Sequence, residues 1–333
     1  MTRLMDRLAL TVAALGTAIG TAALWPAAAH AQADYPNKPV TLVTAFAPGS
    51  GPDATLRMVA DKLGKLWVQR VQVENRPGGG GFIAMDAVKR AAPDGYTLLQ
   101  LDSDHLAAVP HLYKQKGADA LKGFEPVASI FRTTFLVAVA TDSPFKTVAD
   151  IVAAAKAAPG KVTYGSWGVG SPGHLGGELL ELQTGARMQH IPYREVSQLF
   201  MSVGAGDVAW SLATLPSSSG AYKAGKLRYL ADAANKRLPQ LPEVPTAAQA
   251  GGPADFDVNA FVVLVAPKGL PVAVRNKVNA DMAKVLADPE VKARFDTFAF
   301  EPISWSTDEI SRAAEVKSKV YEQLVKKANI SLE

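Results

Sequence analysis

Short apolar runs rich in β-branched residues alternate with segments of helical period along the first third of the chain. This order, strand–helix–strand–helix–strand, is typical of a sheet whose parallel strands are covered by helices. Pro52 stands at the expected start of the first helix, where its missing N–H costs nothing. The expected elements are strands Val40–Phe46, Val71–Asn75 and Tyr96–Leu101 and helices Asp53–Leu66 and Phe82–Ala91.

The middle of the chain repeats this alternation between two long β-rich runs. Phe124–Ala140 is longer than one strand needs, so we expect it to carry the chain from one lobe into another. Phe256–Ala266 is a second such run, and the chain then turns helical, with a capping box at Ser306–Glu309. The expected helices are Thr147–Ala158, His174–Thr184, Glu195–Ala205, Pro271–Leu286, Pro289–Arg294 and Ser306–Lys327, and the strands are Val162–Gly165, His190–Tyr193, Val208–Leu212 and Leu227–Ala231.

Together these patterns predict an α/β fold of two lobes, each a mostly parallel sheet flanked by helices. We expect residues 32–134 and 260–333 to form the first lobe and residues 135–259 the second, with a ligand cleft between them. The crossings should lie near Thr133–Leu136 and Asn259–Phe261. The C-terminal helices would then pack back on the first lobe.

Composition narrows the class of protein. The chain has 333 residues, of which 48% are hydrophobic, enough for two domains of ordinary size. It has no Cys, which excludes a disulfide scaffold, a thiolate zinc site and a cysteine nucleophile. The net charge of +4 comes from 35 basic and 31 acidic residues without a basic stripe. We therefore expect no nucleic-acid partner.

The first 31 residues have the features of a cleavable signal peptide. Arg3 and Arg7 precede an uncharged apolar run, Leu8–Leu24, and Ala29–Ala31 supplies the small-x-small pattern that a signal peptidase reads. A membrane anchor is the alternative, but the run is rich in Ala, Gly and Thr and ends in a cleavage pattern. The sequence therefore predicts export, which in a bacterium means the periplasm.

A Gly-rich turn follows the first strand of each predicted lobe. Pro48–Asp53 and Gly168–Gly173 both lead into a helix, where glycines let backbone N–H groups converge on an anion. The second turn matches G-x-G-x-x-G, with Glu195 near the place of a ribose acid, but an exported protein is not supplied with dinucleotides. Facing turns without a P-loop lysine suit a small carboxylate. The alternative is that both are only tight turns.

The sequence contains no residue set typical of catalysis or metal binding. Ser171 has Val169 instead of Gly two positions before it, so no nucleophile elbow is present. The histidines after the leader lack metal-ligand spacing. Asp102–His105, at the end of the third strand, is a polar contact to a ligand, a solvated loop or a cation site. We expect a protein that is not an enzyme and that has no catalytic residue, metal or cofactor.

A set of motifs in fixed order resembles the Bug family, the TctC-like substrate-binding proteins of tripartite tricarboxylate transporters. The resemblance covers nearly the whole chain after residue 31. The motifs are Tyr35–Val40, Phe46–Asp53, Glu74–Gly78, Pro93–Leu99, Tyr164–Ser166, Gly168, Gly170–Ser171, His174–Leu175, His190–Tyr193, Gly225–Arg228, Leu241–Thr246 and Ala266–Gly269.

This resemblance implies a monomeric, two-lobed periplasmic binding protein, type II-like in fold, that closes on a small organic acid and delivers it to membrane permease subunits. The expected ligand is a di- or tricarboxylate or an aromatic acid. The resemblance implies ligand contacts from Phe46, Gly49, Ser50, Gly51 and Asp53 and from Ser166, Gly168, Gly170, Ser171 and His174. Their positions add Pro48, Ser103, Asp104, Trp167, Tyr193 and Trp210 as candidates.

Three departures from the family pattern bear on the ligand. Glu195–Val196 replaces the usual small residues at the lip of the second lobe, and Trp167 stands where a small residue is usual. Ala209 replaces an acid, which disfavours a ligand with an ammonium group. The two tryptophans, at 167 and 210, favour an aromatic carboxylate. An exported hydrolase of small esters or amides, or a ligand-sensing subunit, is the alternative.

Overall fold

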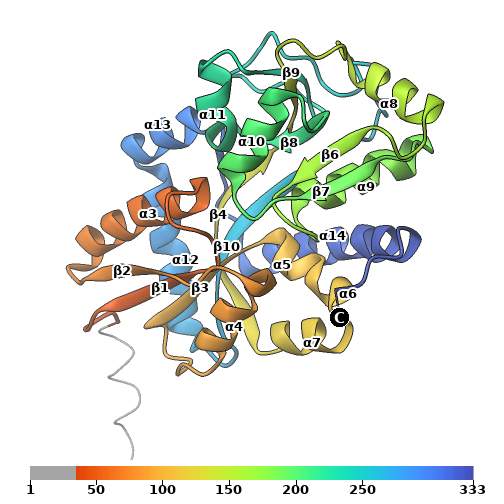
Figure 1. The fold of residues 1–333 in the computed structure, drawn as a ribbon. Coiled ribbons are helices and arrows are strands. Elements are labelled where there is room, and N and C mark those ends of the chain that lie inside the picture. The colour runs from red at the N-terminus through yellow and green to blue at the C-terminus, as the bar shows by residue number, and fades with distance from the viewer. Residues whose placement is uncertain (1–34, 333) are drawn as a thin grey trace, which may run out of the picture. The chain divides into compact units, whose positions relative to one another are not determined.

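Six strands form the first sheet of the computed structural model, which describes residues 35–332 of the chain (Figure 1). Their order is β11-β4-β10-β3-β1-β2. β1 pairs in parallel with β2 and β3, and β10 pairs antiparallel with β3 and β4. The strands are β1 (Val40–Thr44), β2 (Val71–Asn75), β3 (Thr97–Asp102), β4 (Phe124–Thr134), β10 (Asn259–Pro267) and β11 (Glu301–Pro302).

Five strands form the second sheet, in the order β7-β6-β8-β5-β9. β6 pairs in parallel with β7 and β8, whereas β5 runs antiparallel to β8 and β9. The strands are β5 (Leu136–Ala140), β6 (Thr163–Ser166), β7 (Gln189–Pro192), β8 (Trp210–Ala213) and β9 (Leu227–Asp232).

The predicted two-lobed α/β fold class is confirmed, but the sheets are mixed, not mostly parallel. β5 and β10 are the strands that the chain enters directly from a crossing between the sheets. They run away from the crossing, whereas their neighbours run toward it. This direction makes them antiparallel to both neighbours, a consequence of topology that the composition of a single strand does not reveal.

The predicted helices are all present within a few residues of their expected bounds. They are α3 (Gly51–Trp67), α4 (Phe82–Lys89), α8 (Val148–Ala157), α9 (Pro172–Thr184), α10 (Val196–Ala205), α12 (Val272–Ala287), α13 (Pro289–Thr297) and α14 (Thr307–Lys327). The prediction missed shorter helices: η1 (Gly79–Gly81), α5 (Ser103–Ala107), α6 (Val109–Leu112), α7 (Lys114–Leu121) and α11 (Leu215–Lys223). Most of these are too short to show a helical period in the sequence.

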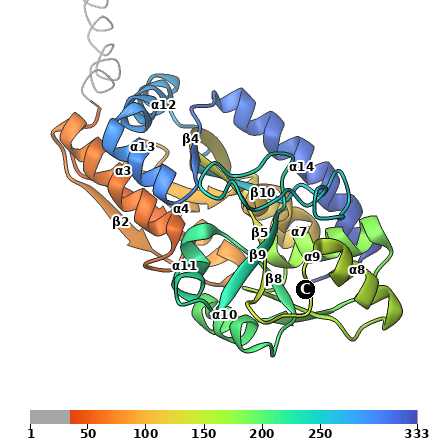
Figure 2. The ribbon, with the colours of Figure 1, turned by 90° about the horizontal axis from the view of Figure 1, so that it is seen from above.

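The C-terminal helices pack on the first sheet, as predicted. α12 contacts β4 and α3, while α14 contacts β4, α5 and also α9. Seen from above, α14 lies on the opposite side of β10 from α10 and α11 (Figure 2). Its predicted capping box is confirmed, because the Ser306 Oγ accepts from the Glu309 N–H and the Glu309 carboxylate accepts from the Ser306 N–H. Between residues 35 and 332, no helix combines the length and the apolar character that crossing a bilayer demands.

The chain passes between the two sheets at two adjacent places. Thr134, the last residue of β4, is the register partner of Asn259, the first residue of β10. Phe135 alone separates β4 from β5, and its carbonyl accepts from the Ala233 N–H. The Val258 N–H in turn donates to the Ala233 carbonyl, so both crossings are tied to the end of β9. The predicted crossings therefore lie side by side.

A close approach between α9 and β6 fixes the packing beneath the second sheet. A Cβ atom at Gly177 would lie 2.2 Å from Cε2 of Tyr164. The Tyr164 ring is buried, and its hydroxyl donates to Glu178, so it has little freedom to move aside. Only glycine lets this turn of α9 approach the ring.

We therefore expect Gly177→Ala to lower the free energy of unfolding by about 1–3 kcal/mol, the usual cost of overpacking. Gly220→Ala is the matched control, because Gly220 is exposed on α11 and has open space around its Cα. Its free energy of unfolding should stay the same or rise by about 0.5 kcal/mol through helix propensity. Urea unfolding followed by circular dichroism measures both. Equal stabilities of the two variants would contradict the packing described above.

Candidate functional site

The turn between β1 and α3 is held by one buried carboxylate. Asp53 accepts from the Gly49 N–H at 2.8 Å, the Asn75 side-chain amide at 2.7 Å and the Arg57 guanidinium at 3.1 Å. Burial raises the pKa of Asp53, but the hydrogen bonds from Asn75, Arg57 and Gly49 outweigh it and leave the pKa below its ordinary value. Asp53 therefore positions the turn as an anion, and its carboxylate is already occupied by groups of the protein.

The rest of this first turn is open to solvent. Pro48 and Gly49 are exposed, and Gly49 has a φ of +79°, a conformation that favours glycine. The Ser50 hydroxyl caps α3 by accepting from the Asp53 N–H. The ring of Phe46 lies edge-on to that of His105, with centroids 5.8 Å apart. His105 was not among the predicted ligand contacts, although its spacing from Asp102 is that of a capping box.

The turn between β6 and α9 repeats the same arrangement. The Gly170 N–H donates to Nδ1 of His174 at 3.0 Å, four residues later, as the Gly49 N–H donates to Asp53. The Ser171 hydroxyl caps α9 by accepting from the His174 N–H and donates to the Gly168 carbonyl. The φ of Gly168 is +126°, which only glycine adopts without strain.

A pair of histidines lies beneath this second turn. The rings of His174 and His190 stack with centroids 4.0 Å apart, and the Glu178 carboxylate lies 3.5 Å from Nε2 of His174. Ser166 Oγ donates to the Gly168 carbonyl, so it accepts from Nε2–H of His190 at 2.7 Å. Burial, followed by the proximity of His174, lowers the pKa of His190 to about 4. His190 is therefore neutral near pH 7.

The two turns face a common junction between the sheets. A Cβ atom at Gly51 in the first turn would lie 3.3 Å from Cγ of Pro216, at the start of α11. One at Gly170 in the second turn would lie 2.6 Å from Cδ1 of Leu112 in α6. Each turn thus touches an element that follows a strand of the opposite sheet, and Leu112 and Pro216 are two junction residues that the sequence did not reveal.

Trp167 and Tyr193 also belong to the second turn. Trp167 is half-buried, and its indole stacks on the ring of Phe135, the residue at the crossing, with centroids 5.8 Å apart and planes at 25°. The Tyr193 N–H donates to the Ser166 carbonyl, and its half-buried ring packs near Gly165. Trp167 therefore presents an aromatic surface beside the junction.

Three predicted residues lie away from the turns. Trp210 is fully buried in the core of the second sheet, stacked against Tyr164, because its position on β8 faces the helices and not the junction. Ser103 and Asp104 point toward α14, where Asp104 accepts from the Tyr321 hydroxyl. Ser103 Oγ accepts from the Phe261 N–H. In this structure none of the three side chains is available to a ligand at the junction.

The polar cluster Asp102–His105 is satisfied internally. Asp102 accepts from the N–H groups of Asp104 and His105 and lies 2.6 Å from Nδ1 of His105. Burial lowers the pKa of His105, but the adjacent Asp102 carboxylate outweighs it and raises the pKa above its ordinary value. Over residues 35–332, no group of three acidic or histidine side chains is arranged to hold a metal ion.

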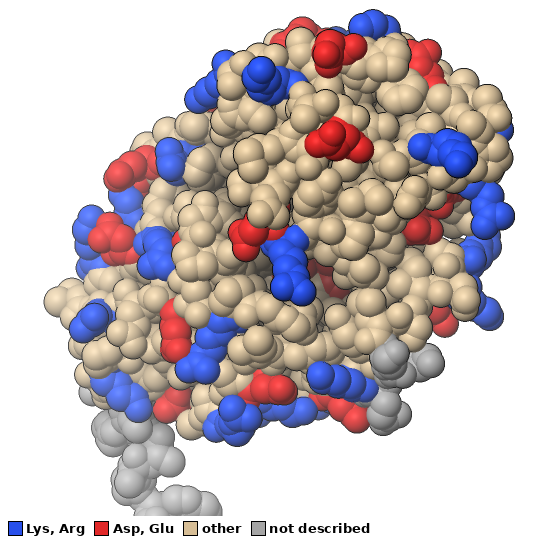
Figure 3. All heavy atoms as spheres, viewed as in Figure 1, with Lys and Arg blue, Asp and Glu red and all other residues tan. Residues whose placement is uncertain are grey.

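Charges of both signs are interspersed on the face of the molecule drawn in Figure 3. No single-sign patch dominates that face, consistent with the near balance of 35 basic and 31 acidic residues. Selectivity at the junction therefore depends on local groups and not on a long-range field.

Two mixed sheets joined by paired crossings, with a serine-capped glycine turn from each sheet at their junction, define a two-lobed α/β binding-protein fold. Residues 55–330 match the tripartite tricarboxylate transporter family receptor, TctC. The chain belongs to this family, as the resemblance predicted. It is a family of solute-binding proteins, not of enzymes.

Relatives with known structures share this fold over most of the chain. Protein BugT of Bordetella pertussis is 30% identical, over 93% of this chain and 92% of BugT. The structure of R. palustris Rpa4515 with adipate is 30% identical and has a TM-score of 0.82, covering 90% of this chain and all of that one. MatC from Rhodopseudomonas palustris with bound malate is 26% identical, with a TM-score of 0.78, covering 87% of this chain and all of MatC.

The neutral state of His190 predicts a pH dependence of stability. Its pKa is about 4 in the folded protein against an ordinary value of 6.5, so between these values the unfolded chain binds more protons. Stability from this group is therefore lost as the pH falls from about 6.5 toward 4. We expect a loss of about 1 kcal/mol, less than the full shift implies, because solvent screens the partly exposed ring.

The measurement is the difference in unfolding free energy between the wild type and His190→Gln across this pH range. A difference is needed because burial raises the pKa of Asp104 and of Asp232 to about 6, which acts in the opposite direction. Gln keeps an N–H for Ser166 but does not titrate. The control is His111→Gln, since His111 is half-buried and bonded to Ser318 far from the turn. A difference that stays constant between pH 6.5 and 4 would refute the assignment.

Proposed function

We propose that this protein is a periplasmic solute-binding protein that captures a small organic carboxylate at the junction of its two glycine turns. The observation that carries this proposal is the matched pair of turns. Each has its glycine N–H held by a side chain four residues later, and each leads into a serine-capped helix. The helix N-termini and spare backbone N–H groups then provide a favourable site for an anion.

Unpaired amides in both turns support this role. The N–H groups of Gly51 and Val169 have no hydrogen-bond partner among the described residues. Gly51 opens α3, where the first N–H groups of a helix lack internal partners. A carboxylate with one oxygen near each turn would satisfy both. Such a ligand makes more contacts when the turns approach, so its binding favours a closed arrangement.

The relatives that bind adipate and malate support a carboxylate as the ligand class. Within this class we propose an acid with an aromatic or other flat apolar body. Trp167 offers the support for this finer proposal, since its half-buried indole faces the junction and is held in place by stacking on Phe135. Trp210 lends no such support because it is buried in the core.

The lobes and the partner follow from the same proposal. We assign residues 32–134 and 260–333 to one lobe and 135–259 to the other, moving about Phe135 and Val258. A membrane permease of a tripartite transporter would read the closed form. The predicted signal peptide, residues 1–31, lies outside the described residues, and export to the periplasm is part of the proposal.

A ligand panel tests this function. Adipate, malate and phenylacetate, with phenylacetamide as the uncharged counterpart, are titrated against the protein by thermal shift and calorimetry. A ligand at 100 times its dissociation constant should add about 2.7 kcal/mol to stability and raise the melting temperature by several degrees. Loss of this effect with phenylacetamide would show that the carboxylate is recognised. No shift with any acid, or consumption of a ligand during the assay, would overturn the proposal.

Trp167 variants test the finer assignment. Trp167→Ala should weaken an aromatic acid by roughly 2- to 12-fold, the equivalent of one stacking contact, while Trp167→Phe should stay near the wild type. The affinity for an aliphatic acid such as adipate should change less in both variants. Equal losses for aromatic and aliphatic acids would leave the carboxylate assignment intact but contradict the aromatic one.

A further inference from the structure

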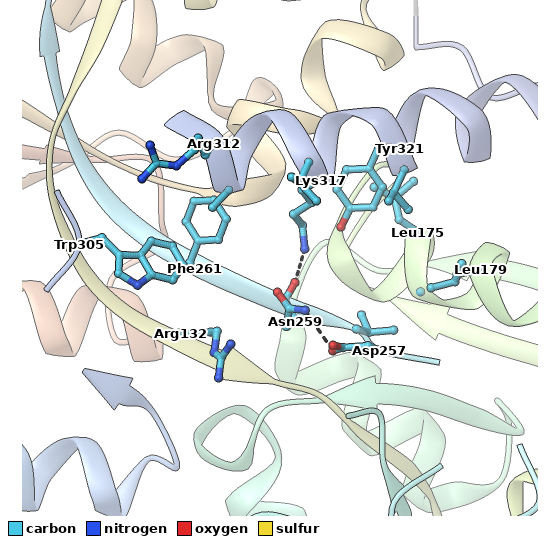
Figure 4. Close-up of a pocket in the computed structure, with 15 residues that line it drawn as sticks. Arg132, Leu175, Leu179, Asp257, Asn259, Phe261, Trp305, Arg312, Lys317 and Tyr321 are labelled. Atoms are coloured by element: carbon cyan, nitrogen blue, oxygen red, sulfur yellow. Dashed lines mark hydrogen bonds between the residues drawn. The ribbon is translucent and has the colours of Figure 1, made fainter. Parts of the chain in front are cut away.

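A second cavity lies away from the glycine turns, between α14 and α9 (Figure 4). It has a volume of about 400 Å³ and is floored by the start of β10, where the chain returns from the second sheet. Walls from both halves of the fold therefore meet in it. The lining includes Leu175 and Leu179 from α9, Phe261 from β10, and Arg312, Val316 and Val320 from α14.

The walls of this cavity are largely apolar and include a pair of rings. Trp305 and Phe261 meet edge to face, with centroids 5.2 Å apart and planes at 65°. Val316 and Val320 leave 66% and 48% of their surface exposed, one turn apart on the same side of α14. Such exposure of apolar side chains beside aromatic rings is a surface that a flat apolar body would cover.

The charged groups of the cavity are mostly cationic. Arg132, Arg312 and Lys317 line it, against a single acid, Asp257. Asp257 already accepts from the Asn259 side chain.

Two of the three cations are also engaged. Arg132 pairs with Glu301, and the Lys317 ammonium donates to the Asn259 carbonyl and lies 3.6 Å from Asp104. Arg312 forms no hydrogen bond or ion pair with any residue between 35 and 332. One guanidinium is therefore free to receive an anion at the edge of an apolar cavity.

We propose that this cavity is a second binding site, separate from the glycine turns, for a small carboxylate with an aromatic body. The carboxylate would pair with Arg312, whose planar fork matches its two oxygens, and the ring would lie against Trp305 and Phe261. The proposal does not depend on which ligand the junction binds.

The position of the cavity couples this site to the turns. α9 contributes Leu175 and Leu179 to the cavity and is capped by Ser171, within the second turn. A change in the angle between the two halves moves α9 relative to α14, so an occupant of the cavity favours the angle seen here. By linkage, it should raise the affinity of the junction for its ligand, and the junction ligand should raise its affinity by the same factor.

The test uses ¹⁹F NMR of protein labelled with 5-fluorotryptophan, because Trp305 reports on the cavity and Trp167 on the junction. Single Trp→Phe substitutions assign the resonances. Phenylacetate is the probe, with phenylacetamide as its neutral counterpart and adipate as an aliphatic acid. The variants are Arg312→Gln and, as the matched control, Arg90→Gln, which removes an exposed arginine from the end of α4.

The expected result is a saturable shift of the Trp305 resonance with phenylacetate, with a midpoint that differs from that of Trp167. Arg312→Gln should raise the Trp305 midpoint roughly tenfold, the loss of one charge-assisted pair, and Arg90→Gln should leave it unchanged. Phenylacetamide should behave in the wild type as phenylacetate does in Arg312→Gln.

Two outcomes would overturn the proposal. A Trp305 shift that follows the Trp167 curve and ignores Arg312→Gln would report only closure around a junction ligand. A silent Trp305, with or without a shift of Trp167, would mean that the cavity takes no such acid. In both cases the carboxylate function of the junction is decided separately, by the ligand panel and by Trp167.

Discussion

The pairing of β4 with β10 at Thr134 and Asn259 is the constraint on which the rest of the structure depends. Because the chain leaves and re-enters the first sheet at neighbouring positions, the two halves share one narrow connection instead of a broad interface. The ends of β1, β3, β6 and β8 then all point toward that connection, and so do the turns that follow them. The packing of Trp167 on Phe135 links the second turn directly to it.

The two glycine turns have the same internal design with different chemistry. In both, a glycine N–H donates to a side chain four residues on, but the acceptor is an anionic carboxylate in Asp53 and a neutral ring nitrogen in His174. A negative charge at both places would repel a bound carboxylate. The first turn offsets its charge with Arg57, and the second avoids charge by keeping its acceptor a histidine stacked on a neutral His190. The turns are thus shaped in advance, which reduces the ordering cost of binding.

Local sequence patterns were sufficient for the elements and the turns but not for side-chain direction. Strand Val71–Asn75 and the capped start of α14 were predicted to the residue, since β-branched composition and capping are local signals. The burial of Trp210 and the orientation of Asp104 toward Tyr321 depend on which face of a strand or helix meets a neighbour from far along the chain. The antiparallel direction of β5 and β10 depends on topology in the same way, as do the contacts of Leu112 and Pro216 with the turns.

This division between local and long-range determinants also bears on ligand choice. If backbone N–H groups hold the carboxylate, relatives that share only 26–30% of their residues with this chain can bind carboxylates without sharing side chains, because an amide is present at every position except proline. The body of the acid, by contrast, meets side chains that differ from one chain to the next, and here Trp167 and the exposed Glu195 stand at the second turn. A bulky ring in that place removes space from a flexible aliphatic acid while adding a surface for a flat one. The same fold therefore keeps one recognition group constant and varies the other.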